Sequence, residues 1–252
     1  MVKLGWLAKT QKIEEKLKNL YGFFGIASLL NLSKIGVGEI AFRKKESRGF
    51  SPLTLALWLR KGELECLSLE ISDFDKKKLA NSLGKLKSLT LRPFDEIKLE
   101  LKAVLLECGV ILCYTPKLKN SCVSGASRWH GNNILIQISD AGKKEDIFWF
   151  TLFHELGHTL KHLYNSKKAN FIDLEDEHKN ELEIEADNFA TETLVPSSEY
   201  NNWKTSSDLS FENITSFAYS IGVDPGIVAG RLNHDKLIDF SQTSKLKRQL
   251  SF

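Results

Sequence analysis

The amino-acid sequence predicts an α+β protein in which a mainly helical first part precedes a small sheet packed on a long apolar helix. Helical spacing of apolar residues dominates the first third of the chain. Short β-branched runs bounded by turn formers follow, and then comes a strongly apolar helical segment over residues 147–164. We therefore expect a helical N-terminal or connecting region over residues 1–90, an α+β domain over 91–240, and a basic, solvated tail over 241–252.

Composition narrows the class of protein. Hydrophobic residues make up 42% and charged residues 27% of the 252 residues, which is typical of soluble globular proteins and excludes a disordered chain or a fibre. A net charge of +3 is too small to argue for nucleic-acid binding. No stretch has the form of a signal peptide or approaches the roughly 20 apolar residues of a membrane span. We expect a cytoplasmic protein without a membrane partner.

The first third contains three helix predictions. Apolar residues recur at helical spacing from Ile13 to Leu30, and the glycines interrupt only the end of this stretch. Pro52 opens a second run of helix-forming residues that continues without a breaker to Gly62. Asp73 is expected to cap a third helix that follows it.

The α+β part begins with a helix after Pro93 that is expected to end at Gly109. The β-branched run from Val110 to Thr115 then predicts a strand. Two further strands are predicted at residues 124–129 and 134–139, and the turn formers between them predict a hairpin.

Two helices are expected to complete this part. Asp146 is a candidate N-cap for the apolar segment IFWFTLFHELGHTLKHLY, which should be a buried helix. A second helix is expected from about Glu177 to Thr193, ending before Pro196. The chemistry of the chain is concentrated in these two segments.

The first helix carries the motif His154-Glu155-Leu156-Gly157-His158. Histidines at i and i+4 lie on one helix face, so both imidazoles can reach one zinc ion about 2.0–2.1 Å away. Glu155, on an adjacent face, can then act as the general base toward a water whose pKa zinc lowers to about 7. The alternative is a core helix with two hydrogen-bonded histidines, but burying these three groups in so apolar a helix is costly.

A catalytic zinc site needs a third protein ligand. One known pattern places a third histidine ten positions after the first, with a glycine between, but Lys161 and Tyr164 occupy those positions here. His162 continues the i+4 series, yet it lies about 12 Å along the helix axis from His154. We therefore expect His162 to be a surface residue or an outer partner of the site rather than a ligand.

The second helix offers carboxylates instead. Glu183 and Asp187 are four residues apart, so one helix face can present Glu183 to the metal and Asp187 to the free nitrogen of a ligand histidine. Glu181 and Glu185 are expected to be solvated. Taken alone, this helix would also fit an acidic surface face.

The motif HELGH followed by ELEIEADNFATETLVP resembles the ImmA/IrrE family of metallopeptidases, in which a zincin-like domain packs a small twisted sheet on the H-E-x-x-H helix. SGASRWHGNNILIQIS and FAYSIGVDPGIVAGRLNHDKLI extend the resemblance to a long subgroup of antitoxin-like regulators. The N-terminal third, with GWL, FFGIAS and LALWLRKGE, is similar to the connecting region of that subgroup, so the resemblance covers nearly the whole chain.

The resemblance implies a zinc-dependent endopeptidase that cleaves a helix-turn-helix repressor and so relieves repression. It implies His154, His158 and Glu183 as ligands, Glu155 as the base, and Asp187 as an outer partner. Members of the subgroup carry a helix-turn-helix domain before the GW segment, whereas this sequence begins there at Met1. Direct DNA binding is therefore not expected without a partner.

Two further sets of residues complete the predicted site. The strand containing Ser127, Arg128 and Trp129 is expected to be a free edge along which an extended peptide substrate pairs. A partner for the transition-state oxyanion is also needed, and the candidates are Arg231, His234 and Tyr200. Arg231 could instead cap a helix or pair with an acidic neighbour.

Two other classes of function are alternatives to an enzyme. A non-catalytic, antitoxin-like regulator could keep the fold without cleaving anything, although such a module has no chemical need for Glu155. A nucleic-acid-binding protein would have to use the basic clusters at residues 44–48, 76–78 and 245–248, which are more often solvated faces. Manganese or iron could also take the place of zinc in a His-His-Glu site.

Overall fold

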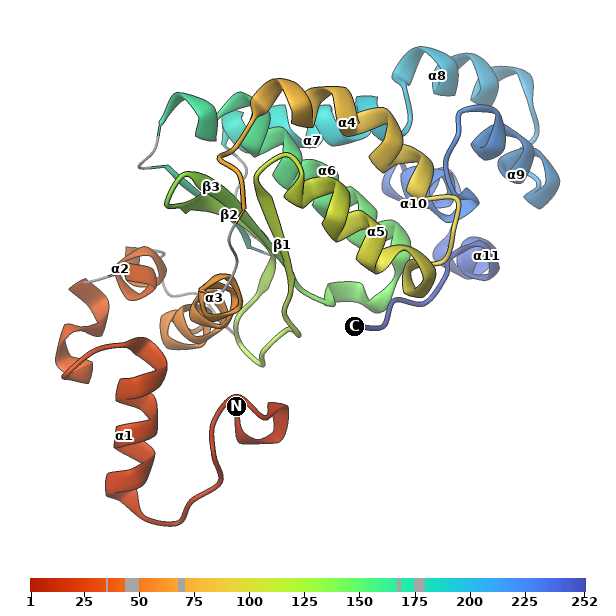
Figure 1. Cartoon of the computed structure of the whole chain (residues 1–252). Coiled ribbons are helices and arrows are strands. Elements are labelled where there is room, and N and C mark those ends of the chain that lie inside the picture. The colour runs from red at the N-terminus through yellow and green to blue at the C-terminus, as the bar shows by residue number, and fades with distance from the viewer. Residues whose placement is uncertain (35, 44–49, 68–70, 167–168, 175–179) are drawn as a thin grey trace. The chain divides into compact units, whose positions relative to one another are not determined.

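The computed structural model describes residues 1–252 except 35, 44–49, 68–70, 167–168 and 175–179. Its contacts divide the chain into two compact units (Figure 1). The first comprises Met1–Ser68 with Lys117–Cys122, and the second comprises Leu69–Pro116 with Val123–Phe252. The first is helical and the second contains both helices and a small mixed sheet, which confirms the α+β class and the helical region before it.

The described helices of the first unit follow the predicted pattern with shifted ends. Gly25 adopts a left-handed conformation with φ 66°, so the first helix stops well before Leu30. The helix opened by Pro52 instead continues through Gly62. The basic cluster at 44–48 lies outside the described residues. The helices are α1 (Ile13–Phe24), α2 (Gly36–Arg43) and α3 (Pro52–Cys66), with short 3-10 turns at Val2–Leu4 and Leu29–Lys34.

One stretch of this unit has the length and composition of a membrane span. It is Ile13–Glu39, which contains an 18-residue window of mean hydropathy 1.4 and runs across residue 35, outside the described residues. This differs from the expectation that no segment would approach such a span. A core helix or a signal sequence meets the same criteria, so the stretch by itself assigns no membrane.

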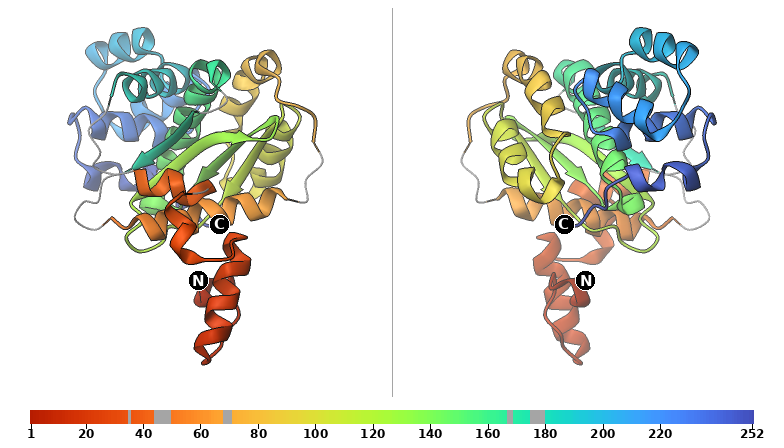
Figure 2. Two further views of the ribbon diagram at one scale, coloured as in Figure 1. Left: turned by 90° about the vertical axis from the view of Figure 1, so that its left-hand side faces the viewer. Right: turned by 90° about the vertical axis from the view of Figure 1, so that its right-hand side faces the viewer.

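Within the described residues, the second unit has a four-stranded sheet in the order β1-β3-β2-β4. The strands β2 and β3 form the predicted hairpin, with Gly131 at φ 63° in its turn. β1 is parallel to β3, while β4 is antiparallel to β2 and forms an edge, visible in teal in the left view of Figure 2. The strands are β1 (Val110–Tyr114), β2 (Val123–His130), β3 (Asn133–Ile138) and β4 (Asn170–Leu174).

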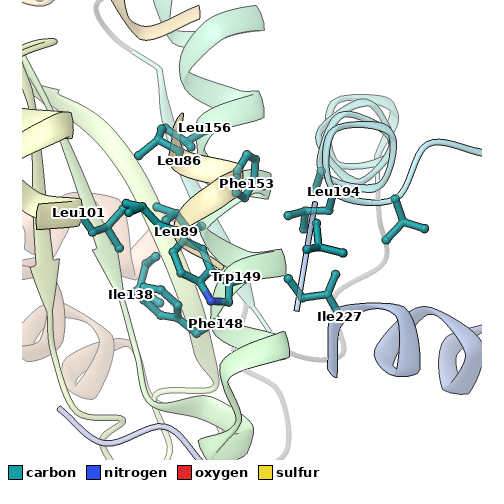
Figure 3. Packing of buried hydrophobic residues seen from close by; sticks show 14 of the residues in the cluster. Leu86, Leu89, Leu101, Ile138, Phe148, Trp149, Phe153, Leu156, Leu194 and Ile227 are labelled. Carbon is teal, nitrogen blue, oxygen red and sulfur yellow. The ribbon is translucent and has the colours of Figure 1, made fainter. Parts of the chain in front are cut away.

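Helices cover the face of the sheet on which the core forms. Alternate residues of β3, from Ile134 to Ile138, join α5 and α6 in one buried cluster. Figure 3 shows Phe148, Trp149 and Phe153 of α6 at its centre. The helices are α4 (Lys76–Leu89), α5 (Phe94–Leu106), α6 (Glu145–Lys161), α7 (Glu181–Leu194), α8 (Ser197–Ser206), α9 (Phe211–Ser220), α10 (Pro225–His234) and α11 (Phe240–Thr243).

The observed division of the chain differs from the expected boundary at residue 90. Helix α4 belongs to the second unit because its Leu79 and Leu86 are fully buried in that unit's core. The chain after residue 240 also packs there rather than remaining solvated. Leu246 and Leu250 are buried, and Arg248 forms an ion pair with Glu145. Apolar residues interspersed among the basic ones hold this segment in place.

Two predicted helix caps were placed on the wrong residue. Asp75, not Asp73, caps α4 by accepting a hydrogen bond from the backbone nitrogen of Lys78. Helix α6 begins after Lys144, so Asp146 lies inside its first turn. By sequence alone Asp75 is as good a cap as Asp73, whereas Lys144, at the N-cap of α6, makes no side-chain cap hydrogen bond.

Candidate metal centre

Helix α6 places the H-E-x-x-H residues in the interior of the second unit. Its residues from Thr151 to Leu160 are all buried, and it packs against β2 and β3. His154 and His158 face α7, whereas Glu155 faces β2. The helical spacing therefore sends the two imidazoles and the carboxylate to different neighbours, as the motif predicts.

Helix α7 brings a carboxylate to the same point. Asn180 caps its first turn through hydrogen bonds to the backbone nitrogens of Leu182 and Glu183. Gly157, in the middle of the motif, allows α7 to approach closely, because a Cβ there would lie 3.1–3.2 Å from atoms of Phe189 and Ala186. Glu183 consequently reaches the two histidines.

The three side chains converge on one small volume. His154 Nε2 and His158 Nε2 are 3.0 Å apart, and Glu183 Oε2 lies 3.2 Å from the first and 3.3 Å from the second. Tetrahedral ligands about 2.0–2.1 Å from a zinc ion are separated by roughly 3.3 Å from one another. The donor set and its spacing therefore fit one metal ion with little movement.

Asp187 holds the other side of His154. Its Oδ1 is 2.9 Å from His154 Nδ1, which leaves Nε2 directed at the common point. Burial acts to lower the pKa of His154, but the contacts with Asp187 and Glu183 outweigh it and raise that pKa to about 10. In the metal-free protein the imidazole is thus protonated, and a metal replaces that proton.

His158 is held by an aromatic ring and a second histidine. Phe171 of β4 stacks on its imidazole at 4.2 Å between centroids, and His162 Nδ1 is 2.9 Å from its Nδ1. His162 in turn contacts Glu185, which also pairs with Lys161. Burial lowers the pKa of His158, and the charge of His154 acts in the same direction. A neutral imidazole is the form that binds a metal.

Glu155 is completely buried, and neither carboxylate oxygen has a hydrogen-bond partner of normal geometry among the described residues. Burial raises its pKa to about 8, although the charge of His154 and the Ser127 hydroxyl act to lower it. A buried carboxylate without a partner is costly unless a cation or a ligand compensates it. A cation bound at the three ligand atoms would supply that compensation.

Glu183 has the opposite environment. Burial acts to raise its pKa, but contacts with His154 and His158 lower it well below the usual value. Asp173 of β4 adds negative charge near His154 and Glu155 and raises the pKa of both. The site thus gathers more carboxylates than cations, which favours binding of a positive ion.

Residues 111–232 match the model of a known family, the IrrE N-terminal-like domain, Peptidase_M78. The matched segment contains every residue of the His-His-Glu group. Residues 111–232 form an M78 peptidase domain. The resemblance to the ImmA/IrrE family is thereby confirmed for residues 111–232, a metallopeptidase domain of this family with a His/His/Glu group that could hold a metal ion. A search of the curated proteins found no match.

The prediction that the strand containing Ser127, Arg128 and Trp129 is a free edge of the M78 domain is wrong. Ser127, Arg128 and Trp129 lie on β2, which pairs with β3 on one side and β4 on the other. Ser127 is fully buried, Arg128 donates to Gln137 Oε1 at 3.2 Å, and Trp129 Nε1 donates to the carbonyl oxygen of Leu163. A short strand contributed after the H-E-x-x-H helix covers the edge that the sequence left open.

The three oxyanion candidates share one partner in the M78 domain. Asp235 Oδ2 accepts from the Tyr200 hydroxyl at 3.0 Å and from Arg231 Nε at 3.1 Å, and Asp235 Oδ1 is 3.2 Å from His234 Nδ1. Tyr200 is almost fully buried, whereas Arg231 and His234 line a cavity that Asp187 also lines. Arg231 therefore pairs with an acidic neighbour, the alternative considered for it, and an oxyanion role stays a prediction.

Sequence reasoning missed three residues next to the M78 site. Phe171 and Asp173 lie on β4, a five-residue strand in a polar region that offers only a short apolar alternation, FIDL, as a signal. Gly125 lies against Glu155, and a glycine inside a strand does indicate a close approach of other atoms. That rule could have found Gly125, whereas the partner of Phe171 could not be found without the tertiary structure.

Proposed function

We propose that this M78 domain is a zinc-dependent endopeptidase that cleaves a helix-turn-helix transcriptional repressor in the cytoplasm and so relieves repression. One observation carries the peptidase part. Three ligand atoms lie 3.0–3.3 Å apart beside the buried carboxylate of Glu155. The family resemblance supports the repressor as substrate, and the chain would reach it as a protein partner rather than by binding DNA itself.

The donor set supports zinc as the metal. Two imidazole nitrogens and one carboxylate oxygen form a common catalytic zinc set, although manganese or iron can occupy the same donors under different supply. When bound, zinc lowers the pKa of its water to about 7 and polarises a carbonyl oxygen. His154, His158 and Glu183 would hold the ion, and Asp187 orients His154 through Nδ1.

Glu155 supplies the proton transfer. Its carboxylate accepts a proton from the attacking water and returns it to the amine nitrogen as the peptide bond breaks. A cation held by His154, His158 and Glu183 would lower the pKa of Glu155 from about 8 and so favour its ionised form. A residue confined to packing would not need an ionisable group at this buried position.

Metal content and cleavage test the proposal separately. Elemental analysis should find about one zinc ion per chain in the wild type, and loss of zinc in Glu183→Gln and His158→Ala. Glu181→Gln, on the same helix and exposed, is the matched control. No zinc in the folded wild type, even after zinc is supplied, would overturn the metal site.

Cleavage is then measured by incubating helix-turn-helix repressors with the zinc-loaded chain. Wild type should cut one of them, and Glu155→Gln should retain the zinc but lose the cleavage. A zinc-bound wild type that cuts none of them would support the non-catalytic regulator instead.

A further inference from the structure

We infer that a cavity between α6, α7 and α10 binds a tyrosine side chain of the peptide substrate, with Asp146 as the group that recognises its hydroxyl. The inference rests on the proposed peptidase function and adds a substrate preference to it. The cavity has a volume of ≈ 470 Å³. This lies within the range of about 300–1,000 Å³ that is common for ligand pockets.

The cavity adjoins the cluster of His154, His158 and Glu183. Asp187, whose Oδ1 contacts His154 Nδ1 at 2.9 Å, is one of its lining residues. Ile147 and Phe150 lie about two turns and one turn before His154 on α6, respectively, and line it as well. A side chain inserted here would therefore belong to a residue that flanks the bond positioned at the metal.

Most of the lining is apolar and comes from three helices. Ile184 and Leu194 contribute from α7, and Ile227 contributes from α10. Figure 3 shows Leu194 and Ile227 projecting from these two helices. Ile147, Phe150 and Ile184 are among the exposed large hydrophobic residues, with 39%, 38% and 50% of their surface accessible. A large apolar side chain would cover this surface and gain the free energy of its burial.

Asp146 brings a buried carboxylate to the cavity. The side chain of Asp146 is 5% exposed, and its Oδ2 pairs with Lys247 Nζ at 2.8 Å. Its Oδ1 has no hydrogen-bond partner among the described residues. Gly230 leaves room for this carboxylate, because a Cβ there would lie 2.9 Å from Oδ2. A buried acceptor without a donor is destabilising until a ligand supplies one.

The charges select a neutral donor over a cationic one. Asp146 is neutralised by Lys247, and Asp187 is paired with His154. Arg231 and Lys247 also line the cavity, so a lysine or arginine side chain would meet like charges. A phenol combines a large apolar body with one terminal hydroxyl donor, which matches both the walls and Asp146 Oδ1.

Binding to an inert chain tests this preference without cleavage. The probes are three seven-residue peptides of glycine, alanine and serine with a single central tyrosine, phenylalanine or lysine. They are titrated by NMR against the zinc-loaded Glu155→Gln chain. We expect the tyrosine peptide to bind about ten-fold more tightly than the phenylalanine peptide, because it alone satisfies Asp146. Equal binding of these two peptides, or preference for lysine, would overturn the inference.

Variants locate the effect in the cavity. Asp146→Ala would leave Lys247 buried without its partner and could fail to fold. Thr191→Phe keeps the ion pair between Asp146 and Lys247 and fills the cavity, so it should abolish the preference for tyrosine. Leu182→Phe, on the exposed side of α7, should retain that preference.

A double variant replaces the ion pair by apolar residues. Combining Asp146→Leu with Lys247→Met makes this part of the cavity apolar and should reverse the preference toward phenylalanine. Retention of tyrosine preference in Thr191→Phe or in the double variant would refute the assignment.

The two proposals fail in different ways. If the zinc-loaded wild type cleaves no repressor while the inert chain still prefers the tyrosine peptide, the peptidase function fails and the cavity assignment stands. If a repressor is cleaved but the three peptides bind equally, the assignment fails alone.

Discussion

The backbone of Gly125 lies directly against the carboxylate of Glu155, and a Cβ at residue 125 would sit 2.6 Å from Glu155 Oε1. The same added atom would lie 2.9 Å from Thr151 Cγ2, so the space is closed on two sides. Strand β2 thereby fixes the position of the Glu155 carboxylate through the absence of a side chain at residue 125. A glycine is the residue that permits such contact.

Replacing Gly125 with alanine should displace Glu155 without touching the ligands. Overpacking of this kind costs about 1–3 kcal/mol of stability. Because the Glu155 carboxylate is displaced from the reacting position, kcat/KM for repressor cleavage should fall roughly ten-fold or more. Zinc content should not change, because His154, His158 and Glu183 are not contacted. Gly84→Ala is the control, since nothing lies within 4 Å of its added Cβ. Full activity in Gly125→Ala would contradict this view of the base.

Replacing Asp187 with asparagine should weaken metal binding. The contact at His154 Nδ1 orients the ring and increases its basicity, and loss of such outer partners costs about 10–100-fold in metal affinity. Competition with a zinc chelator measures the change. Glu181→Gln, which removes an exposed carboxylate from the same helix, should bind zinc as the wild type does. Equal affinity in Asp187→Asn would show that the ring is fixed by other contacts.

The metal-free protein should be most stabilised by its ligand cluster in a weakly acidic window. The pKa of His154 is raised from 6.5 to about 10, so its contribution is complete below pH 6.5 and is lost as pH rises through about 10. The pKa of Glu183 is lowered from 4.5, so its contribution is present above pH 4.5 and is lost as pH falls. Both pKa shifts arise in part from the contact between His154 and Glu183, so this contact is strongest between pH 4.5 and 6.5.

Urea unfolding across this pH range measures that contribution. The difference in free energy of unfolding between the wild type and Glu183→Gln, both metal-free, should pass through a maximum in the window and decline on either side. A difference that does not vary with pH would rule out the charged pair.

The C-terminal segment should contribute to stability. Arg248 Nε pairs with the buried Glu145 at 2.8 Å, and Arg248 Nη2 lies 3.2 Å from Asp224. Arg248→Ala leaves the Glu145 carboxylate buried without its cation, so the free energy of unfolding should fall by about 3 kcal/mol. Lys245→Ala, at an exposed position nearby, should change it by less than about 0.5 kcal/mol. Equal stability of the two variants would indicate that the segment is not docked in solution.

The chemistry was readable from the sequence because its spacing follows helix geometry. His154 and His158 are one turn apart, and Glu183 and Asp187 are one turn apart, so each pair was assigned to a face before any fold was known. The hairpin and the helix after Pro93 were equally local. The predicted sheet, hairpin and long apolar helix are all present.

The errors arose where distant segments meet. Strand β4 is five residues long, and its pairing with β2 depends on tertiary contacts that no local pattern reveals. The docking of the segment after residue 240 depends on Glu145 and Asp224, which lie more than a hundred and about twenty residues away in the chain. Choices between adjacent caps, such as Asp73 and Asp75, depend on where the helix is stopped by its neighbours.

Close packing at Gly157 makes the distance between ligands independent of the chain that joins them. Phe189 and Ala186 rest where a side chain of residue 157 would lie, so the two helices meet at a fixed separation and Glu183 follows from that meeting. Strand β4, which lies between α6 and α7 in the chain, adds Phe171 against His158 but is not part of this helix contact. A change in the length of the chain between β4 and α7 should therefore leave the spacing of the three ligand atoms unchanged.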